Sequence, residues 1–250
     1  MNPVAVSVIV FTCVFGGAIL GMVLGKVLPE HHMSSDSKDV VKLGTGLIGT
    51  MAALVLGLVV ASAKSSYDAQ SNELTEVSTK TILLDRTLAD YGPEAKGTRG
   101  LLRDTVAQAI DRVWPKDSSK APQLKPQPVI AVLFNRIEGL NPQNDLQSSL
   151  KAQALNLIVD IGQTRVLMFE QSGNPISAPF LIILTFWLAI IFLSFGMYAP
   201  VNATVVVTLL VCAISVSAAI FLVIELGEPY QGLVRLSSTP LRNALAELDR

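Results

Sequence analysis

Charged residues are scarce in this chain. Asp, Glu, Lys and Arg make up 16% of its 250 residues, whereas they make up roughly a quarter of an ordinary soluble domain. The 19 basic and 20 acidic side chains nearly cancel, so net charge would attract neither a nucleic acid nor an acidic partner. Half of the residues are hydrophobic, which also excludes a disordered or collagen-like chain.

Residue types that carry chemistry are equally few. Cys13 and Cys212 form no CxxC or zinc spacing, and His31 and His32 are adjacent, so they would not share a helix face around a metal. No P-loop, GxSxG or kinase motif is present. Residues 44–49 fit a dinucleotide fingerprint by their letters, but they open an uncharged stretch instead of following a strand. We therefore predict no enzyme activity, no metal site and no cofactor.

Three stretches contain no Asp, Glu, Lys or Arg at all, namely 1–25, 43–63 and 171–224. A helix needs about 20 apolar residues to cross a bilayer core of about 30 Å. The first two stretches therefore supply one span each, and the third, which turns at Ala199-Pro200, supplies two. The first stretch lacks the basic start and the cleavage site of a signal peptide. We expect an all-α membrane protein with four transmembrane helices.

This interpretation divides the chain into four parts. Residues 1–64 hold the first two spans and a short outer loop, 65–175 a helical cytoplasmic domain, 176–226 the third and fourth spans, and 227–250 a cytoplasmic tail helix. Cytoplasmic loops are enriched in Lys and Arg, and the middle segment and tail hold 16 of the 19 basic residues. When only the Lys and Arg residues near the span ends are counted, five lie on the side of the middle segment and tail and three lie on the other side. We predict a multi-pass protein of the inner membrane of the cell, with both termini cytoplasmic.

Helical periodicity continues from the second span into the middle segment. Neither Gly nor Pro occurs over 58–91, and apolar or small residues recur there in steps of 3, 4 or 7. The same register runs back into the second span, which predicts one helix over 43–91. Shorter helices are expected over about 93–114, 129–140 and 141–170, with a proline-rich linker at 116–128. The fourth would begin with Asn141 as its cap.

Small residues mark one face of each of the first two spans. No water drives association inside a bilayer, so membrane helices gain from the close backbone approach that small residues permit. The expected packing residues are Gly17, Gly21 and Gly25 in the first span and Gly49, Ala53 and Gly57 in the second. The opposite face of the second span would contact lipid, or a pore if several copies surrounded an axis. Its members, the candidate pore-lining residues, are Ile48, Met51, Val55 and Leu58.

Short motifs are spread along the chain, most densely around the last two spans. Their central residues, the signature residues, are Asp85, Arg86, Arg165, Trp187, Gly196, Pro200, Asn202, Glu225, Pro229, Gly232, Ser237 and Pro240. In these motifs the chain resembles a family of bacterial membrane proteins called bestrophin-like, formerly described as a domain of unknown function. The resemblance covers almost the whole chain. It implies a four-helix membrane protein with a distant likeness to bestrophin anion channels.

Two functions remain open at this stage. The first is a homo-oligomeric channel for inorganic ions, conceivably anions, in which the second span forms an apolar constriction. The second is a non-conducting scaffold or sensor that recruits partner proteins through its cytoplasmic helices. No span interior carries an ionisable residue, which disfavours a proton-coupled transporter. The expected partners are the lipid bilayer and further copies of the chain.

Overall fold

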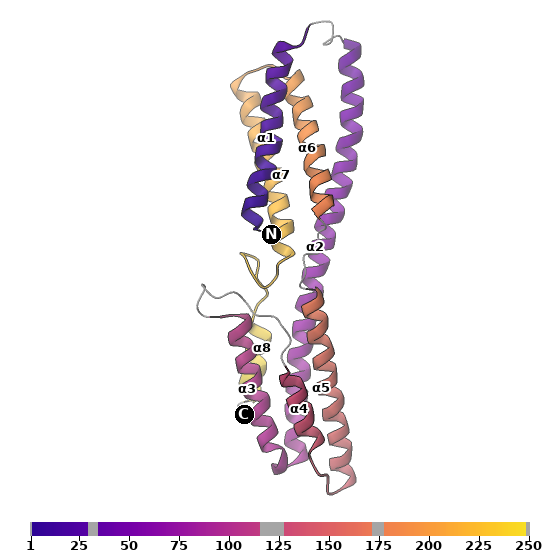
Figure 1. Cartoon of the computed structure of the whole chain (residues 1–250), viewed down its shortest axis with the longest axis vertical. Coiled ribbons are helices and arrows are strands. Elements are labelled where there is room, and N and C mark those ends of the chain that lie inside the picture. Colours follow the sequence, from indigo (N-terminus) through magenta and orange to yellow (C-terminus); the bar gives the residue numbers. More distant parts are fainter. Residues whose placement is uncertain (1, 30–34, 116–127, 172–177, 249–250) are drawn as a thin grey trace. The chain divides into compact units, whose positions relative to one another are not determined.

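The computed structural model describes residues 2–29, 35–115, 128–171 and 178–248. Every regular element in these ranges is a helix, as the sequence predicts. His31, His32 and nearly all of the expected linker lie outside the described residues. The helices, which are labelled in Figure 1, form two compact units. Unit 1 comprises 1–65 and 174–227, and unit 2 comprises 66–173 and 228–250.

Unit 1 is built from four helices that are long and apolar enough to cross a membrane. They are α1 (Pro3–Val27), the first part of α2 (Ser35–Tyr91), α6 (Ala178–Tyr198) and α7 (Ala203–Leu226). Asparagine caps start two of them: the Asn2 side chain accepts hydrogen bonds from the first amides of α1, and Asn202 accepts one from the Val205 amide at 2.8 Å. These caps satisfy amides that have no partner inside the helix.

The tightest contact in unit 1 joins α1 to α6. A Cβ atom built on any of three of the four α1 glycines would come within 3.0 Å of an α6 backbone carbonyl oxygen. The pairs are Gly17 with Ala189, Gly21 with Leu193, and Gly25 with Met197. Gly196 meets the Ala18 carbonyl in the same way from the α6 side. Residue numbers rise together along both helices, so α1 and α6 run parallel.

The long helix expected over 43–91 is confirmed, and it begins earlier than expected. α2 is one α-helix from Ser35 to Tyr91, and Lys42 pairs with Asp39 at 3.6 Å within the added turns. Polar residues before the span extend the helix because nothing in 35–42 is Gly or Pro. Its end is set by Gly92, whose φ of 128° few other residues adopt.

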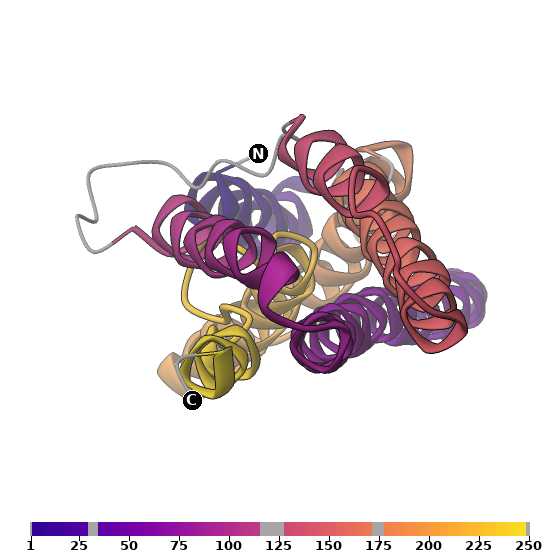
Figure 2. The same ribbon diagram turned by 90° about the horizontal axis from the view of Figure 1, so that it is seen from below.

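Unit 2 contains the rest of α2 and four shorter helices. They are α3 (Lys96–Val113), α4 (Val129–Glu138), α5 (Asp145–Gln171) and α8 (Thr239–Leu248), with a 3-10 turn, η2 (Pro93–Ala95), before α3. Figure 2 shows them nearly end-on, with α8 beside α3 and α4 beside α5. The expectation that Asn141 caps the start of this last helix of the middle segment is wrong, because α5 begins at Asp145. Asn144 does so, because its side chain accepts the Gln147 amide at 2.8 Å.

One hydrophobic core holds unit 2 together. All five helices contribute side chains to it, including Leu241 and Leu248 from α8. Its largest fully buried side chains are Leu84, Leu88, Leu133, Ile137 and Ile158. Burying each such side chain contributes about 1.5–3 kcal/mol. The tail helix is therefore an integral part of this unit.

The α1–α6 contact predicts an asymmetry between neighbouring glycines. Gly21→Ala would force the two backbones apart and should destabilise unit 1 by about 1–3 kcal/mol. Gly16→Ala is the matched control, because a Cβ there meets nothing within 4 Å. Thermal unfolding in detergent should show a lower Tm for Gly21→Ala alone. Equal Tm values for the two variants would contradict the contact.

Continuity of α2 can be tested in unit 2. Ser71→Pro removes one backbone donor, and the proline ring clashes with the preceding turn, at a cost of about 3 kcal/mol or more. Ser71→Ala keeps the helix and serves as the control. Circular dichroism during heating should show early helix loss only in the proline variant. If both variants melt like the parent protein, the helix is interrupted near residue 71.

Candidate functional site

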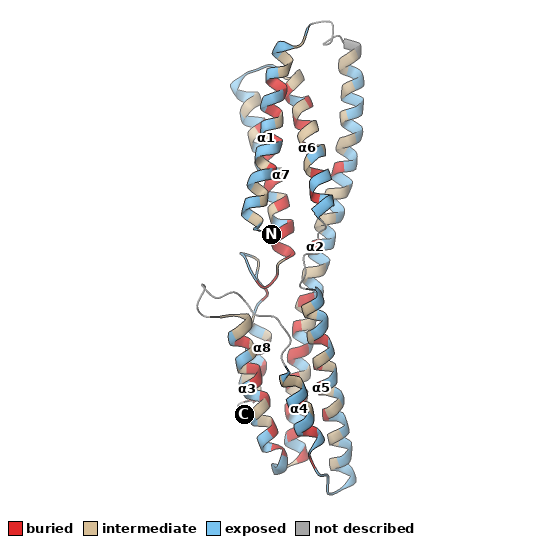
Figure 3. Ribbon diagram, viewed as in Figure 1, coloured by how far each residue is buried: buried red, intermediate tan, exposed pale blue. Residues whose placement is uncertain are grey.

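Among the four apolar helices, α2 is the least covered by its own chain. In the most apolar stretch of 18 residues in α2, 11% of the residues are buried, compared with 28% to 39% in the corresponding stretches of the other three helices. Figure 3 shows this part of α2 as mostly exposed or intermediate. A span this open presents most of its surface to something other than the chain itself. It is therefore the candidate functional surface of unit 1.

The small contact that α2 does make in unit 1 identifies its inner side. The Thr45 hydroxyl donates to the Ser194 hydroxyl of α6 at 3.1 Å, and Ala52, two helical turns later, is buried. Thr45 is half-buried and Ser194 is buried. A hydrogen bond between two hydroxyls is a favourable contact where no water competes for it.

The four candidate pore-lining residues do not share one environment. Ile48 and Val55 are half-buried, because steps of three residues from Thr45 and Ala52 keep them near the α6 side. Met51 and Leu58 are exposed. The uncovered side of α2 therefore includes two of the four candidates, together with Leu47 and Leu54, which are also exposed.

The second small-residue stripe differs from the first. Gly49 is half-buried, Ala53 and Gly57 are exposed, and a Cβ built on either glycine meets nothing within 4 Å. The packing expected of this stripe is therefore not made within one chain. The physical reason is register: α6 contacts the side around Ala52, and one residue further along the helix is about 100° around its axis.

Two adjacent signature residues in α2 have different surroundings. Asp85 is buried and accepts both hydrogen bonds of a forked pair with Arg99, Nε to Oδ1 at 2.8 Å and Nη2 to Oδ2 at 2.7 Å. This bonding raises the pKa of Arg99. Arg86 is exposed. Forked pairs fix the relative orientation of both groups, so Asp85 holds α3 against α2 within unit 2.

Several signature residues after α7 shape the backbone of unit 2. The carbonyl of buried Pro229 accepts the Leu236 amide at 2.7 Å. Gly232 has a φ of 79°, which favours glycine. The Ser237 hydroxyl accepts the Thr239 amide at 3.2 Å, and Pro240 occupies the first turn of α8, where its missing amide hydrogen is not needed. Together they form the turn that leads into α8.

The signature residues of the last two spans are also positioned by packing. Gly196 is buried against α1, Trp187 on α6 is half-buried, and Pro200 is exposed in the turn before α7. Glu225 is buried in the last turn of α7. Arg165 has a different position, since it lines a cavity inside unit 2.

Two arginines were missed by the sequence analysis, Arg99 and Arg112. Arg99 lies 14 residues after Asp85, a spacing that no single helix brings together. Arg112 had a visible signal. It continues the inward-facing stripe of α3 in steps of 3 or 4, after the buried Thr98, Leu102 and Thr105 and the half-buried Ala109. Arg165 continues the stripe of α5 in the same way, four residues after Ile161.

Comparison with the curated proteins and with the solved structures found no match. The family model described as the bestrophin-like domain matches residues 12–241, which takes in most of α1, the other three apolar helices and nearly all of unit 2. Together with those helices, the match makes this a membrane protein, and the chain belongs to the bestrophin-like domain family.

Proposed function

We propose that the protein is a homo-oligomeric ion channel of the inner membrane, in which α2 helices from several copies surround the ion pathway. The observation that supports this most directly is the uncovered side of α2 in unit 1. Family membership supports anions as the permeant ions. The alternative is a non-conducting scaffold, and the experiment below separates the two.

The glycines of α2 support assembly. Gly44, Gly46, Gly49 and Gly57 all have open space where a Cβ would lie. Glycine in a helix interior costs about 1 kcal/mol relative to alanine, and in α2 no contact within the described chain offsets that cost. A second helix lying against Gly46, Gly49 and Gly57, which fall near one side of α2, would do so, as α6 does for Gly17, Gly21 and Gly25 of α1. A further copy of the chain supplies such a helix without any other partner.

The large side chains of the same region support a pathway. Leu47, Met51, Leu54 and Leu58 are exposed on α2 and recur in steps of 3 or 4. Arranged around an axis, they would form successive apolar rings. Apolar rings close a pore by excluding water and open when they widen or become polar. No charged side chain is needed in the span for this kind of gate.

Orientation is part of the proposal. The excess of Lys and Arg in the middle segment and the tail favours the cytoplasm for unit 2 and for both termini. The parallel run of α1 and α6 agrees with four spans that cross the bilayer alternately. The turn between α6 and α7 would then lie on the outer side of the membrane.

Single cysteines test this orientation. In a background with Cys13→Ala and Cys212→Ala, we introduce Val201→Cys in the turn before α7 or Ser148→Cys on α5, both exposed positions. A membrane-impermeant maleimide added to spheroplasts should label Val201→Cys at once and Ser148→Cys only after permeabilisation. The reverse pattern would overturn the proposed orientation.

Conduction is tested by making the uncovered side polar. Met51→Ser and Leu58→Ser should hydrate the apolar rings and raise ion flux into liposomes by about tenfold or more, since each 1.4 kcal/mol removed from a barrier is tenfold in rate. Leu222→Ser is the matched control, an equally drastic change at an exposed position of α7. Anion and cation flux are measured separately, and particle mass is measured in detergent.

Two results would favour the scaffold instead. One is a monomeric mass in detergent and in the bilayer. The other is the absence of flux from the parent protein and from both α2 variants while the oligomer persists. Gly57→Leu gives an independent check on assembly, because a large side chain there should prevent close helix approach and lower the particle mass.

A further inference from the structure

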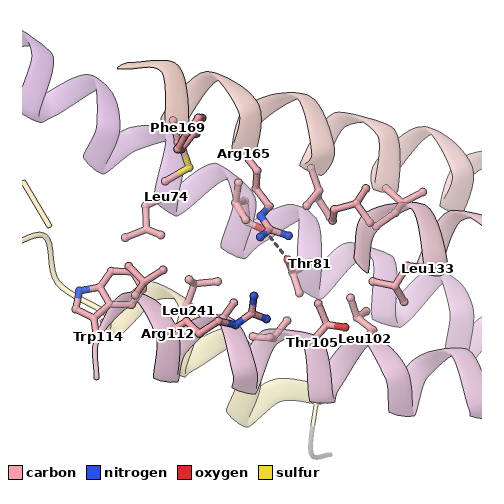
Figure 4. Close-up of a pocket in the computed structure, with 18 of the residues that line it drawn as sticks. Leu74, Thr81, Leu102, Thr105, Arg112, Trp114, Leu133, Arg165, Phe169 and Leu241 are labelled. Carbon is pink, nitrogen blue, oxygen red and sulfur yellow. Dashed lines mark hydrogen bonds between the residues drawn. The ribbon is translucent and has the colours of Figure 1, made fainter. Parts of the chain in front are cut away.

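A second candidate site lies inside unit 2. It is a cavity of about 100 Å³ lined by α2, α3, α4, α5, α8 and the segment that holds Tyr230. Figure 4 shows Arg165 reaching into it from α5 and Arg112 reaching in from α3 on the opposite side. Most of the remaining wall is apolar, with Leu74, Leu102 and others around the two cationic groups.

The two arginines lack the partners that other cations of unit 2 have. Arg99 is paired with Asp85, and Lys80 with Glu76 and Asp160. No Asp or Glu is among the described residues that line the cavity. Arg112 donates from Nε to the Gln108 carbonyl at 3.1 Å, and its charge is not neutralised by that bond.

Arg165 is the less compensated of the two. In the described ranges it has no hydrogen bond and no ion pair with another side chain. Burial, and the charge of Arg112, lower the pKa of the Arg165 guanidinium. An arginine nevertheless stays protonated in a protein. Two like charges therefore face a shared, mainly apolar space, an arrangement that is unfavourable while the space holds no anion.

Two hydroxyl groups of the same cavity are also without partners. Thr105 is 6% exposed and Tyr230 is 4% exposed, and neither hydroxyl oxygen has a hydrogen-bond partner in the described chain. A buried polar group left without a partner costs about 1–3 kcal/mol. Both residues line the cavity, and a hydroxyl can donate to an anion. Burial, and after it the negative charge of Glu73, raise the pKa of the Tyr230 hydroxyl.

We propose that this cavity binds a small organic anion, a carboxylate attached to a short apolar body. Guanidinium forks match the two oxygens of a carboxylate, and the apolar wall matches a hydrocarbon body better than it matches the hydration shell of an inorganic ion. A cavity of about 150 Å³ holds the six carbons of benzene in another protein, so about 100 Å³ suits a smaller body of about four carbons. This proposal stands whether or not unit 1 conducts ions.

The cavity can be reached from the side on which Arg165 lies. Arg165, together with Ile130 and Ile158, also borders a second hollow of about 830 Å³ between α4 and α5. The arginine itself is only half-buried. A carboxylate can thus reach its guanidinium without unfolding of unit 2.

Trp114 provides a direct reporter of occupancy. It lines the cavity, its Nε1 donates to the Leu236 carbonyl at 2.9 Å, and its ring lies edge-on to Tyr230 at 6.3 Å. The chain has two tryptophans, so Trp187→Phe leaves Trp114 as the sole emitter. The full-length protein in detergent is titrated with butyrate, and with butyramide as its uncharged equivalent.

Butyrate should change Trp114 emission saturably, and butyramide should not. Arg165→Gln and Arg112→Gln should each raise the Kd for butyrate about tenfold or more, as expected for loss of a hydrogen bond to a charged group. Arg136→Gln on α4, which is exposed and not part of the cavity wall, should leave the Kd unchanged. Equal binding of butyramide, or equal binding of chloride at the same concentration, would overturn the proposal.

Thermal stability separates a binding role from a structural one. If Arg165 and Arg112 repel each other in the unliganded protein, Arg165→Gln should raise its Tm, and butyrate should raise the Tm of the parent protein but not that of the variant. If Arg165 instead supports the fold, the same substitution lowers the Tm. A lowered Tm together with an unchanged Kd for butyrate would contradict the assignment.

Discussion

Backbone contact between α1 and α6 is the constraint on which unit 1 depends. Inside a bilayer, helices associate through close packing, because lipid tails and apolar side chains are equally good surroundings for one another. The glycines of α1 bring its backbone against that of α6. With α1 also in contact with α7, these three helices use their packing faces on each other. α2 is left with a narrow contact around Thr45 and Ala52, and this explains why so much of its surface is uncovered.

Much of this fold could be predicted because it follows from local rules. Uncharged stretches identify the apolar helices, the absence of Gly and Pro over 58–91 predicts the long helix, and small residues at i and i+4 predict where α1 is approached closely. The residues that cap the helices were harder to predict than the helices themselves. Asn141-Pro142 has the right composition for a helix start, yet the Asn144 side chain caps α5 instead, and composition alone does not decide between two nearby asparagines.

The candidate sites were less predictable, because they depend on pairs of residues from different helices. The stripe of Gly49, Ala53 and Gly57 has the same spacing as the α1 glycines, but only the position of α6 decides that it is uncovered in one chain. Arg99 and Arg112 reach their positions through the turn that folds α3 back along α2. Within unit 2 two kinds of partly buried basic residue can be distinguished: Lys80 and Arg99, which carboxylates of the same unit neutralise, and Arg112 and Arg165, which line an apolar cavity. The first kind specifies the fold, whereas the second costs stability unless something else compensates it.

The register between α1 and α6 also has a consequence for biogenesis. Gly17 contacts Ala189, so the partner of α1 is synthesised about 170 residues later, which takes roughly 10–30 s at 5–20 residues per second. During that interval the glycine face of α1 has no α6 to contact, and residues 66–173 of unit 2 leave the ribosome before the third span does. Unit 1 therefore completes its folding late in translation, and a nascent α1 depends on lipid or on insertion factors until α6 arrives.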